Sequence, residues 1–447
     1  MRHKGSLHEK LFNLTWPIFI ETSLIMLLGM GDIFMLGTYD DNAVAAVGVV
    51  NQMLNMVFLL FGVVTTGTSV LCARYLGMRQ HSSVRQVVGV SILFNLLFSG
   101  TISFFLGFYA REIVGIMDLR EGVCEYAVDY MTWVGSFAWL QAISLTISAI
   151  LRSLQRPKFP MIAILSVNIV NIIGNYFLIF GNGPFEPLGV TGAAFSTVFS
   201  RLVSVLIVIT ALKRIVLPDL SINDIIPFRW NRLKELLQIG LPGAGEMLSY
   251  SLSQVTVTYF INIISNEALI ARTYVVNIVM IAYLFAYAVA QSCSILVGFY
   301  IGEGHTLAAH RLMLHCSRRG IQVSLSLGLI IALIIGPLMG LFTQDSMVLA
   351  MAAIVVWIDV ILEIGRALNM IVIAALRAAG DYIFPVAFGA LSVWGIATGM
   401  SWVLGITWGL GLTGVWIAFA ADENIRGWIM LHRWNRKFHT GELRLKT

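Results

Sequence analysis

An acidic residue within a long apolar segment has the clearest potential for chemistry in this sequence. Asp32 lies in the run LLGMGDIFMLG, fifteen residues after Pro17. At a helical rise of 1.5 Å per residue, this spacing places Asp32 about 22 Å along the segment, within the length that crosses a bilayer. An isolated charge inside a span costs about 2.5–3.5 kcal/mol on insertion scales, so such acids are taken as functional by default. We therefore take Asp32 as the candidate for binding a coupling ion.

A row of asparagines in a later apolar segment supplies the expected partners. Asn168, Asn171 and Asn175 fall on one helical face, at positions i, i+3 and i+7. Asn175 follows Pro160 by fifteen residues, the same spacing that Asp32 keeps from its own proline, so the two side chains meet if both helices start at one membrane face. Burial among neutral partners disfavours a charged carboxylate and so favours proton exchange, but carboxylate and amide oxygens also suit Na⁺. The residues leave both ions open, together with a purely structural role in helix packing.

The second half of the chain carries charges of both signs within its apolar segments. Glu363 and Arg366 stand at i and i+3 and can pair on one helix, and Glu246 is a candidate to complete a charge network with them. Arg201 aligns with Glu423 when the halves are superposed at an offset of 222 residues. Charges of opposite sign within each half predict ion pairs inside that half. We interpret these charged residues as mainly structural.

Further side chains are candidates for ligand contact. The chain has 19 methionines, whose flexible thioethers suit apolar ligands of varied shape, although gap filling is their commoner role. Pro17 removes a backbone hydrogen bond and permits a bend in the segment that carries Asp32. The candidates for substrate contact or for the polar network are Asn168, Gln52, Gln141, Met35, Met53 and Ser196.

These residues sit in a chain that repeats itself. Residues of the first half return in the second at an offset of 225, and near the end the offset changes to 222. Such a register indicates tandem duplication. Asp32 is matched by Val257, so the acid belongs to one half only. The pairs at offset 225 are Pro17 and Pro242, Glu21 and Glu246, Gly77 and Gly302, Arg152 and Arg377, and Pro160 and Pro385.

The composition is that of a polytopic membrane protein. Of 447 residues, 58% are hydrophobic and 12% are charged, about half the charged share of soluble domains. The sequence predicts an all-α membrane protein with twelve transmembrane helices in two homologous six-helix bundles. Because six is even, both bundles enter the membrane in one direction, which predicts a pseudo-twofold axis along the membrane normal. The expected spans are 14–37, 47–73, 86–109, 127–150, 160–182, 189–212, 236–265, 272–300, 316–342, 348–375, 383–409 and 413–432.

The distribution of basic residues predicts the topology. Most of the 29 Lys and Arg fall in segments that are cytoplasmic if the N-terminus is inside, which predicts cytoplasmic termini and a multi-pass protein of the inner (plasma) membrane. The predicted domains are an N-lobe at 1–212, a cytoplasmic linker at 213–235 and a C-lobe with its cytoplasmic tail at 236–447. Each lobe is expected to begin with an amphipathic helix at the inner surface. The first apolar run lacks a cleavage site and is expected to remain as the first span.

The sequence lacks the motifs that are typical of several function classes. The sequence has no GxxxxGK[ST] loop for nucleotide hydrolysis, no HExxH and no GxSxG elbow, so we predict no enzyme. No histidine lies deep in a span, and the four cysteines form no CxxC, so no metal site and no cofactor are expected. The net charge of +5 follows from the membrane topology and gives no case for binding nucleic acid.

The motifs together resemble the multidrug and toxic compound extrusion (MATE) family. The resemblance covers essentially the whole chain and points to the proton-coupled, DNA-damage-inducible-like branch. It rests on the two bundles of six helices, the spacing of Pro17 and Asp32, and the segments ARYLG, LRSLQRPKFP, NIVNIIGNYFLIFG and LRAAGDYIFP in this order.

The resemblance implies cation-coupled antiport of organic, often cationic, amphipathic drugs or toxins. Two lobes would alternate between inward and outward openings, with H⁺ or Na⁺ as the coupling ion and the protein acting as a monomer among membrane lipids. In proton-coupled members the acid on the first helix is the coupling site, and its network corresponds here to Asp32, Tyr130, Asn171 and Asn175. Several relatives carry Asp where this chain has Asn175. In another branch a Na⁺ site uses a Glu on the seventh helix, matched by Glu246, and an Asp on the tenth helix, where the nearest residues of this chain are Arg366 and Glu363. A cation beside Arg366 would be repelled.

Two alternatives of the same superfamily stay open at this point. One is a Na⁺-coupled drug antiporter, and the other is a flippase for lipid-linked oligosaccharides. Such flippases usually have more helices and several basic residues in their cavity. A receptor or scaffold without transport is a rival of a different class, for which two six-helix repeats would be superfluous.

Overall fold

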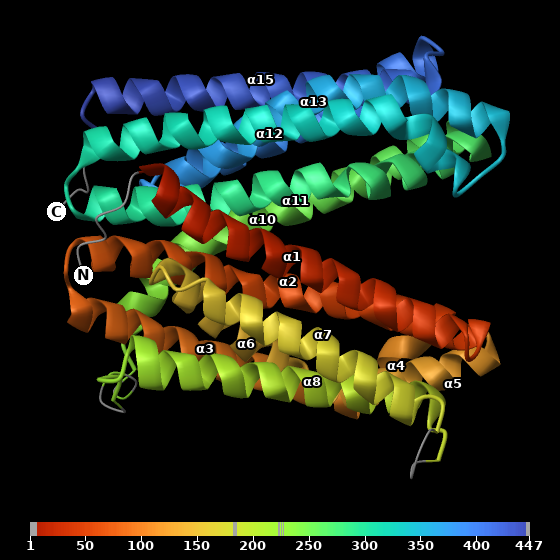
Figure 1. The fold of residues 1–447 in the computed structure, drawn as a ribbon, viewed down its shortest axis with the longest axis horizontal. Helices are drawn as coiled ribbons and strands as arrows, with labels where there is room; N and C mark the ends of the chain where they lie inside the picture. The colour runs from red at the N-terminus through yellow and green to blue at the C-terminus, as the bar shows by residue number, and fades with distance from the viewer. Residues whose placement is uncertain (1–6, 182–185, 222–223, 225, 227, 444–447) are drawn as a thin grey trace. The chain divides into compact units, whose positions relative to one another are not determined.

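The computed structural model describes residues 7–181, 186–221, 224, 226 and 228–443, and all regular structure in these ranges is helical (Figure 1). This confirms the expected all-α class. Within these ranges, nine helices are long and apolar enough to cross a membrane, and a bent helix pair makes a tenth span. The remaining two predicted spans correspond to helices with more polar residues, α10 and α15.

The helices follow the twelve predicted spans in order. The first six spans comprise α1 (Leu7–Gly37), α2 (Asp41–Gly77), α3 (His81–Phe108), the short α4 (Ala110–Gly115), α5 (Glu121–Tyr130) with the π-helix η1 (Met131–Gly135) and α6 (Ala138–Ser153), α7 (Lys158–Leu178), and α8 (Gly189–Ala211) with η2 (Leu212–Val216). The last six comprise α10 (Trp230–Ile264), α11 (Asn266–Gly302), α12 (Thr306–Gly340), α13 (Ser346–Ala378), α14 (Ile383–Ser392) with η3 (Val393–Thr398) and η4 (Ser401–Thr407), and α15 (Gly411–His439).

Contacts divide the chain into two compact units. Residues 20–76 and 80–240 form one unit, and 7–19, 77–79 and 241–443 form the other. The start of α1 joins the second unit because it packs on α11, where Lys10 Nζ donates to the Tyr300 hydroxyl at 3.1 Å and the Phe19 and Phe285 rings are 5.7 Å apart. This grouping differs in detail from the lobes expected at 1–212 and 236–447, which rest on the repeat.

The expected amphipathic surface helices are not separate elements in the described residues. Helix α1 begins at Leu7 and passes through Pro17 without interruption, and α10 begins at Trp230 and passes through Pro242. Each predicted surface segment is therefore the first part of a long span. Residues 1–6 and 444–447, which belong to the predicted cytoplasmic ends, lie outside the described residues.

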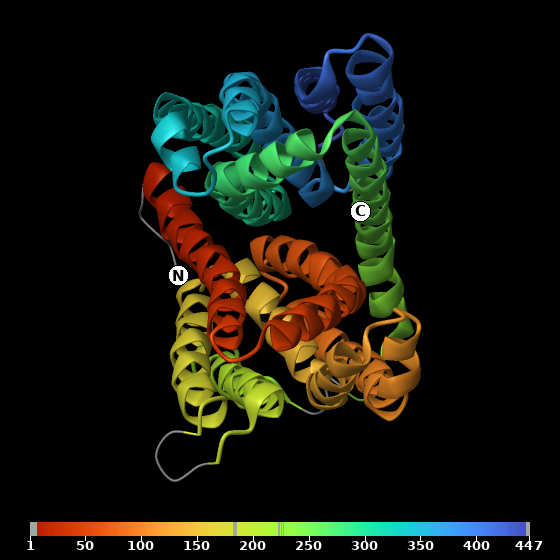
Figure 2. The same cartoon turned by 90° about the vertical axis from the view of Figure 1, so that its right-hand side faces the viewer.

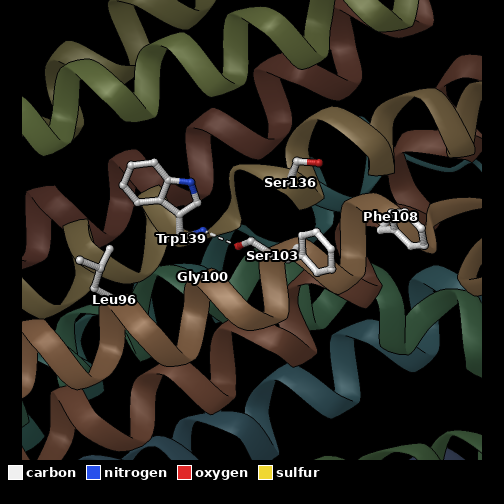
Figure 3. Close-up of a pocket in the computed structure, with 7 residues that line it drawn as sticks. Leu96, Gly100, Ser103, Phe108, Ser136 and Trp139 are labelled. Atoms are coloured by element: carbon white, nitrogen blue, oxygen red, sulfur yellow. Dashed lines mark hydrogen bonds between the residues drawn. The ribbon is translucent and has the colours of Figure 1, made fainter.

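The fourth span is bent, whereas the sequence predicted one continuous helix over 127–150. The segments Gly122–Gly135 and Ala138–Ser153 meet at 46°. The break is stabilised from α3, because the Trp139 backbone N–H donates to Ser103 Oγ at 2.9 Å and so satisfies an amide at the start of α6 (Figure 3). The π-helical turn η1 sits directly before this break, and π turns are frequent at functional sites.

Helices α7 and α8 pack closely against each other, as both Figure 1 and Figure 2 show. Glycines permit this approach. A Cβ added at Gly192 would lie 2.4 Å from the Leu178 carbonyl oxygen, and one at Gly174 would lie 2.4 Å from Ser196 Oγ. The close packing brings the polar side chains of the two helices together.

Replacing Gly192 by alanine tests this packing. The added methyl group meets the backbone of α7, so Gly192→Ala should destabilise the protein by about 1–3 kcal/mol, the usual range for overpacking. Gly62→Ala on α2 is the matched control, because nothing lies within 4 Å of its added Cβ. Thermal unfolding in detergent should show a lower Tm for Gly192→Ala only, and equal Tm values would contradict the close contact.

Candidate functional site

The structure places Asp32 against Asn175. Asp32 on α1 is 7% exposed and Asn175 on α7 is fully buried. The Asn175 Nδ2 atom donates to Asp32 Oδ1 at 2.7 Å. The meeting of these two side chains was predicted from their equal spacing after Pro17 and Pro160, and it is observed.

From Asn175 the polar contacts continue to α8. Asn175 Nδ2 also donates to Asn171 Oδ1 at 3.2 Å, and Asn171 Nδ2 donates to Thr197 Oγ1 at 3.4 Å. Ser196 Oγ donates to the Asn171 backbone carbonyl at 2.9 Å. Sequence reasoning named Ser196 but missed its neighbour Thr197, which only the rotation of α8 identifies as part of this group. Asp32, Asn171, Asn175 and Thr197 thus form one buried cluster across three helices, which we call the Asp32 cluster.

Tyr130, on the fourth span, lies beside the Asp32 cluster. Its side chain is 1% exposed, at the residue that precedes the π-helical turn. Its hydroxyl lies by the side chains of Thr197 and Asn51, and Tyr130 interacts electrostatically with Asp32. Asn51 is a second residue that sequence reasoning missed, because nothing in its spacing sets it apart from other polar residues of α2.

Arg201 does not form the ion pair that the sequence predicted. Internal pairing with an acid was predicted, yet no ion pair among the described residues includes Arg201. Its guanidinium lies over the Phe58 ring, 5.3 Å from the centroid, and its Nη1 atom is buried without a hydrogen-bond partner. The correction follows from helix rotation, since the sequence does not tell which helix face meets an acid.

The remaining predicted residues of this half do not join the hydrogen bonds of the Asp32 cluster. Asn168 Nδ2 donates to the backbone carbonyls of Leu24 at 3.2 Å and Ile164 at 2.9 Å, so Asn168 ties α7 to α1. Met35 and Met53 pack against the apolar core of the unit. Gln52 is exposed and Gln141 is half-buried.

The duplicated acids form duplicated ion pairs. Arg152 Nη1 lies 2.5 Å from Glu21 Oε1, and Arg377 Nη2 pairs with Glu246 Oε2. Each pair joins the first span of a repeat to its fourth, and the two pairs are related by the offset of 225. Glu246 was expected in a network with Glu363 and Arg366, but its partner is Arg377 because α10 presents it to the end of α13. The expected contact between Glu363 and Arg366 on α13 is present.

The second unit has a charge cluster of its own. Arg426 on α15 pairs with Asp422 at 2.7 Å and with Glu423 at 3.2 Å, and Asn369 on α13 donates to Glu423 at 2.8 Å. Trp416 Nε1 donates to Asp359 Oδ1 at 3.1 Å. Asp359 was missed, although its position four residues before Glu363 marks it as being on the same helix face. No group of three or more His, Cys, Asp or Glu among the described residues is arranged to hold a metal ion.

Comparisons with known proteins show which family the chain matches. The MatE family profile matches residues 17–177 and 242–403, one match in each half of the chain. The chain is similar to the uncharacterized transporter YisQ of Bacillus subtilis, with 40% identity over 96% of this chain and 94% of YisQ. It is also similar to the probable multidrug resistance protein NorM of Thermotoga maritima, with 28% identity over 95% of this chain and 91% of NorM.

Solved structures share the fold. A MATE in the bent conformation superposes with a TM-score of 0.89 and 20% identity, covering 98% of this chain and 96% of that chain. A multidrug resistance MATE family transporter in an outward-facing conformation superposes with a TM-score of 0.88 and 20% identity, covering 99% and 98%. At this identity the likeness concerns the fold alone.

The ion pair between Glu21 and Arg152 is open to a double-mutant cycle. Arg152→Gln leaves the Glu21 carboxylate, whose side chain is 8% exposed, without its cation. The loss in free energy of unfolding should approach about 3 kcal/mol, the lower end for buried pairs, because Arg152 is itself 20% exposed. Combining Arg152→Gln with Glu21→Gln should cost less than the sum of the single changes, as measured by thermal unfolding in detergent. Strictly additive losses would show that the two groups do not interact.

Proposed function

The chain belongs to the MatE family of membrane transporters, and on this premise we propose that it is a secondary active multidrug exporter coupled to protons. It would exchange H⁺ for organic, often cationic, amphipathic compounds by alternating access, with Asp32 as the coupling residue. Relatives named as probable multidrug resistance proteins support the class of cargo. The excess of Lys and Arg in the expected inner segments supports an inner-membrane protein with cytoplasmic termini.

The observation that carries the proposal is the pairing of Asp32 with a neutral amide. Ionised Asp32 accepts a hydrogen bond from Asn175 Nδ2 at 2.7 Å. The Oδ1 atom of the same amide is buried and has no hydrogen-bond partner. A protonated Asp32 carries an O–H donor, and this unused oxygen is the adjacent acceptor for it. Both protonation states of Asp32 therefore have a partner on Asn175, because the carboxylate accepts from the amide nitrogen and the protonated carboxyl can donate to the amide oxygen.

The same contact is less suited to Na⁺. A hard cation binds oxygen atoms, whereas Asn175 turns an N–H donor toward the Asp32 carboxylate. Asn171 is engaged in the same manner, since its oxygen already accepts from Asn175 and its amide nitrogen donates to Thr197. Of the two amide oxygens, only that of Asn175 is unpaired, so Na⁺ at Asp32 would gain few oxygen ligands unless Asn171 also reversed and broke its hydrogen bonds to Asn175 and Thr197.

Proton binding would then control cargo binding through charge. Ionised Asp32 attracts a cationic compound, and protonation from outside removes that attraction and releases the compound. A ligand shifts an equilibrium between two conformations only through its different affinity for each, so the proton and the cargo must favour opposite conformations. Exchange of one H⁺ for one monovalent cation moves no net charge across the membrane, so the pH gradient rather than the membrane potential would drive such export.

Helix α1 is suited to transmit this change. Pro17 leaves one backbone carbonyl of the helix without its amide donor, so the helix bends there more readily. One turn later, Glu21 is held to α6 by Arg152. Asp32 lies further along the same helix. We infer that a bend near Pro17 would move Asp32 relative to the fixed Glu21 and so couple its protonation to the shape of the lobe.

Replacing Asp32 by asparagine tests the coupling role. Asp32→Asn keeps the size of the side chain but binds no exchangeable proton, so proton-driven efflux of ethidium from proteoliposomes should be abolished. The folded state should persist, because an amide also satisfies Asn175, and an unchanged elution profile on size-exclusion chromatography would confirm this. Normal efflux by a folded Asp32→Asn protein would rule out coupling at this residue.

The asparagine row provides a matched pair of variants. Asn175→Ala removes the hydrogen bond to Asp32, and a hydrogen bond to a charged group contributes about 1.5–3 kcal/mol, so transport should fall by about tenfold or more. Asn168→Ala removes an asparagine from the same helix face whose amide nitrogen donates to the backbone carbonyls of Leu24 and Ile164, so its effect on the efflux rate should be small. Equal effects of the two changes on the initial rate of efflux would indicate that the row serves packing alone.

A further inference from the structure

The second unit has a groove of about 330 Å³ that the mechanism above does not use. It runs between α12 and α15, and α13, which packs against both of these helices, forms its floor (Figure 1). Leu368 of the floor is 4% exposed, whereas Trp428 on α15 and Leu314 on α12 are 63% and 40% exposed. None of the described residues that line the groove is acidic. The groove is therefore an open, mostly apolar channel on the surface of this unit.

Contacts between α12 and α15 close one end of the groove. His310 precedes Leu314 by four residues on α12, and Trp434 follows Leu431 by three residues on α15. The Trp434 Nε1 atom donates to His310 Nδ1 at 3.1 Å, and the His310 ring stacks on Phe438 with 3.9 Å between centroids. These residues belong to the segments expected at the cytoplasmic surface, so the groove starts there and extends into the bilayer. This placement rests on the topology proposed above.

A cation without an acid stands at the inner end of the groove. Arg318 lines the groove, is exposed, and lies at the start of the expected span 316–342. Arg311, seven residues earlier on the same face of α12, is also exposed. Neither arginine takes part in an ion pair with any described residue. Trp428 exposes its indole at the same groove, as tryptophans do at membrane interfaces.

We propose that this groove binds one anionic phospholipid of the inner leaflet. An acyl chain would lie along Leu314 and Ile321 of α12 and Leu431 of α15, all of which line the groove. The headgroup phosphate would meet the guanidinium of Arg318, because arginine binds phosphate oxygens through paired N–H donors. Basic pockets between spans on the cytoplasmic side recognise anionic headgroups in this way.

The charge of the groove favours an anionic over a zwitterionic lipid. Both kinds of lipid have acyl chains that fit an apolar channel. A zwitterionic headgroup carries a cation beside its phosphate, so it gains less from Arg318 and Arg311. The site takes neither the cargo nor the coupling ion, and the inference therefore goes beyond the proposed function.

Quenching of Trp428 fluorescence by brominated lipids tests the site. Full-length protein is reconstituted in phosphatidylcholine vesicles with a minor fraction of dibrominated phosphatidylglycerol, or in phosphatidylglycerol vesicles with the same fraction of dibrominated phosphatidylcholine. Subtracting the signal of Trp428→Phe isolates this residue from the other tryptophans. Wild type should show about fivefold enrichment of phosphatidylglycerol at Trp428, the effect expected of one arginine near the membrane surface. High salt should reduce this enrichment.

Variants of the cation assign the preference to the groove. Arg318→Gln should abolish the enrichment, and Arg318→Lys should keep most of it. Arg436→Gln is the matched control, because it removes the same charge from an exposed position near the end of α15 that does not line the groove. This control should quench like wild type.

Three outcomes would overturn the proposal. Equal quenching by the two brominated lipids in wild type would mean contact with bulk bilayer only, and this comparison needs no substitution at Arg318. Enrichment that persists in a folded Arg318→Gln protein would exclude Arg318 as the headgroup partner. Equal loss in Arg318→Gln and Arg436→Gln would point to general surface charge. The measurement uses no cargo and no ion gradient, so each of these failures would leave the proposed exporter intact.

Discussion

The structure around the candidate site depends on one requirement, that a carboxyl buried in an apolar span needs a partner in whichever protonation state it occupies. Asn175 meets this requirement for Asp32. Its amide nitrogen donates a hydrogen bond to the carboxylate, and its buried oxygen has no other partner and can accept from the protonated carboxyl. The surrounding elements keep that amide in place. Glycines let α7 and α8 pack closely, and Asn171 links Asn175 to Thr197.

The repeat separates what both halves need from what one half does. The ion pairs of Glu21 with Arg152 and of Glu246 with Arg377 recur at the offset of 225, so they belong to the shared scaffold. Asp32 has no counterpart, because its matched position, Val257, is a fully buried apolar residue. The second unit holds acids and arginines in direct ion pairs, whereas the Asp32 cluster leaves its acid with an amide and its arginine apart. This difference is why we assign coupling to the first half and structural support to the second.

Spacing along the chain predicted the contacts that depend on depth in the membrane. The equal distances from Pro17 and Pro160 brought Asp32 to Asn175, and the interval of three residues brought Glu363 to Arg366. Spacing did not predict contacts that depend on how helices rotate against one another. The partner of Glu246, the position of Arg201 over Phe58 and the role of Thr197 are of this kind. The bend in the fourth span was also not predictable, because a serine on another helix stabilises it.

The central claim is that Asp32 releases its proton when cargo binds, and this exchange can be measured directly. Purified full-length protein in weakly buffered detergent solution should release a proton on binding ethidium, as reported by a pH indicator dye. The account predicts release close to one proton per bound ethidium in wild type, and no release from Asp32→Asn at equal occupancy. Equal release from both proteins, or binding to wild type without release, would contradict it.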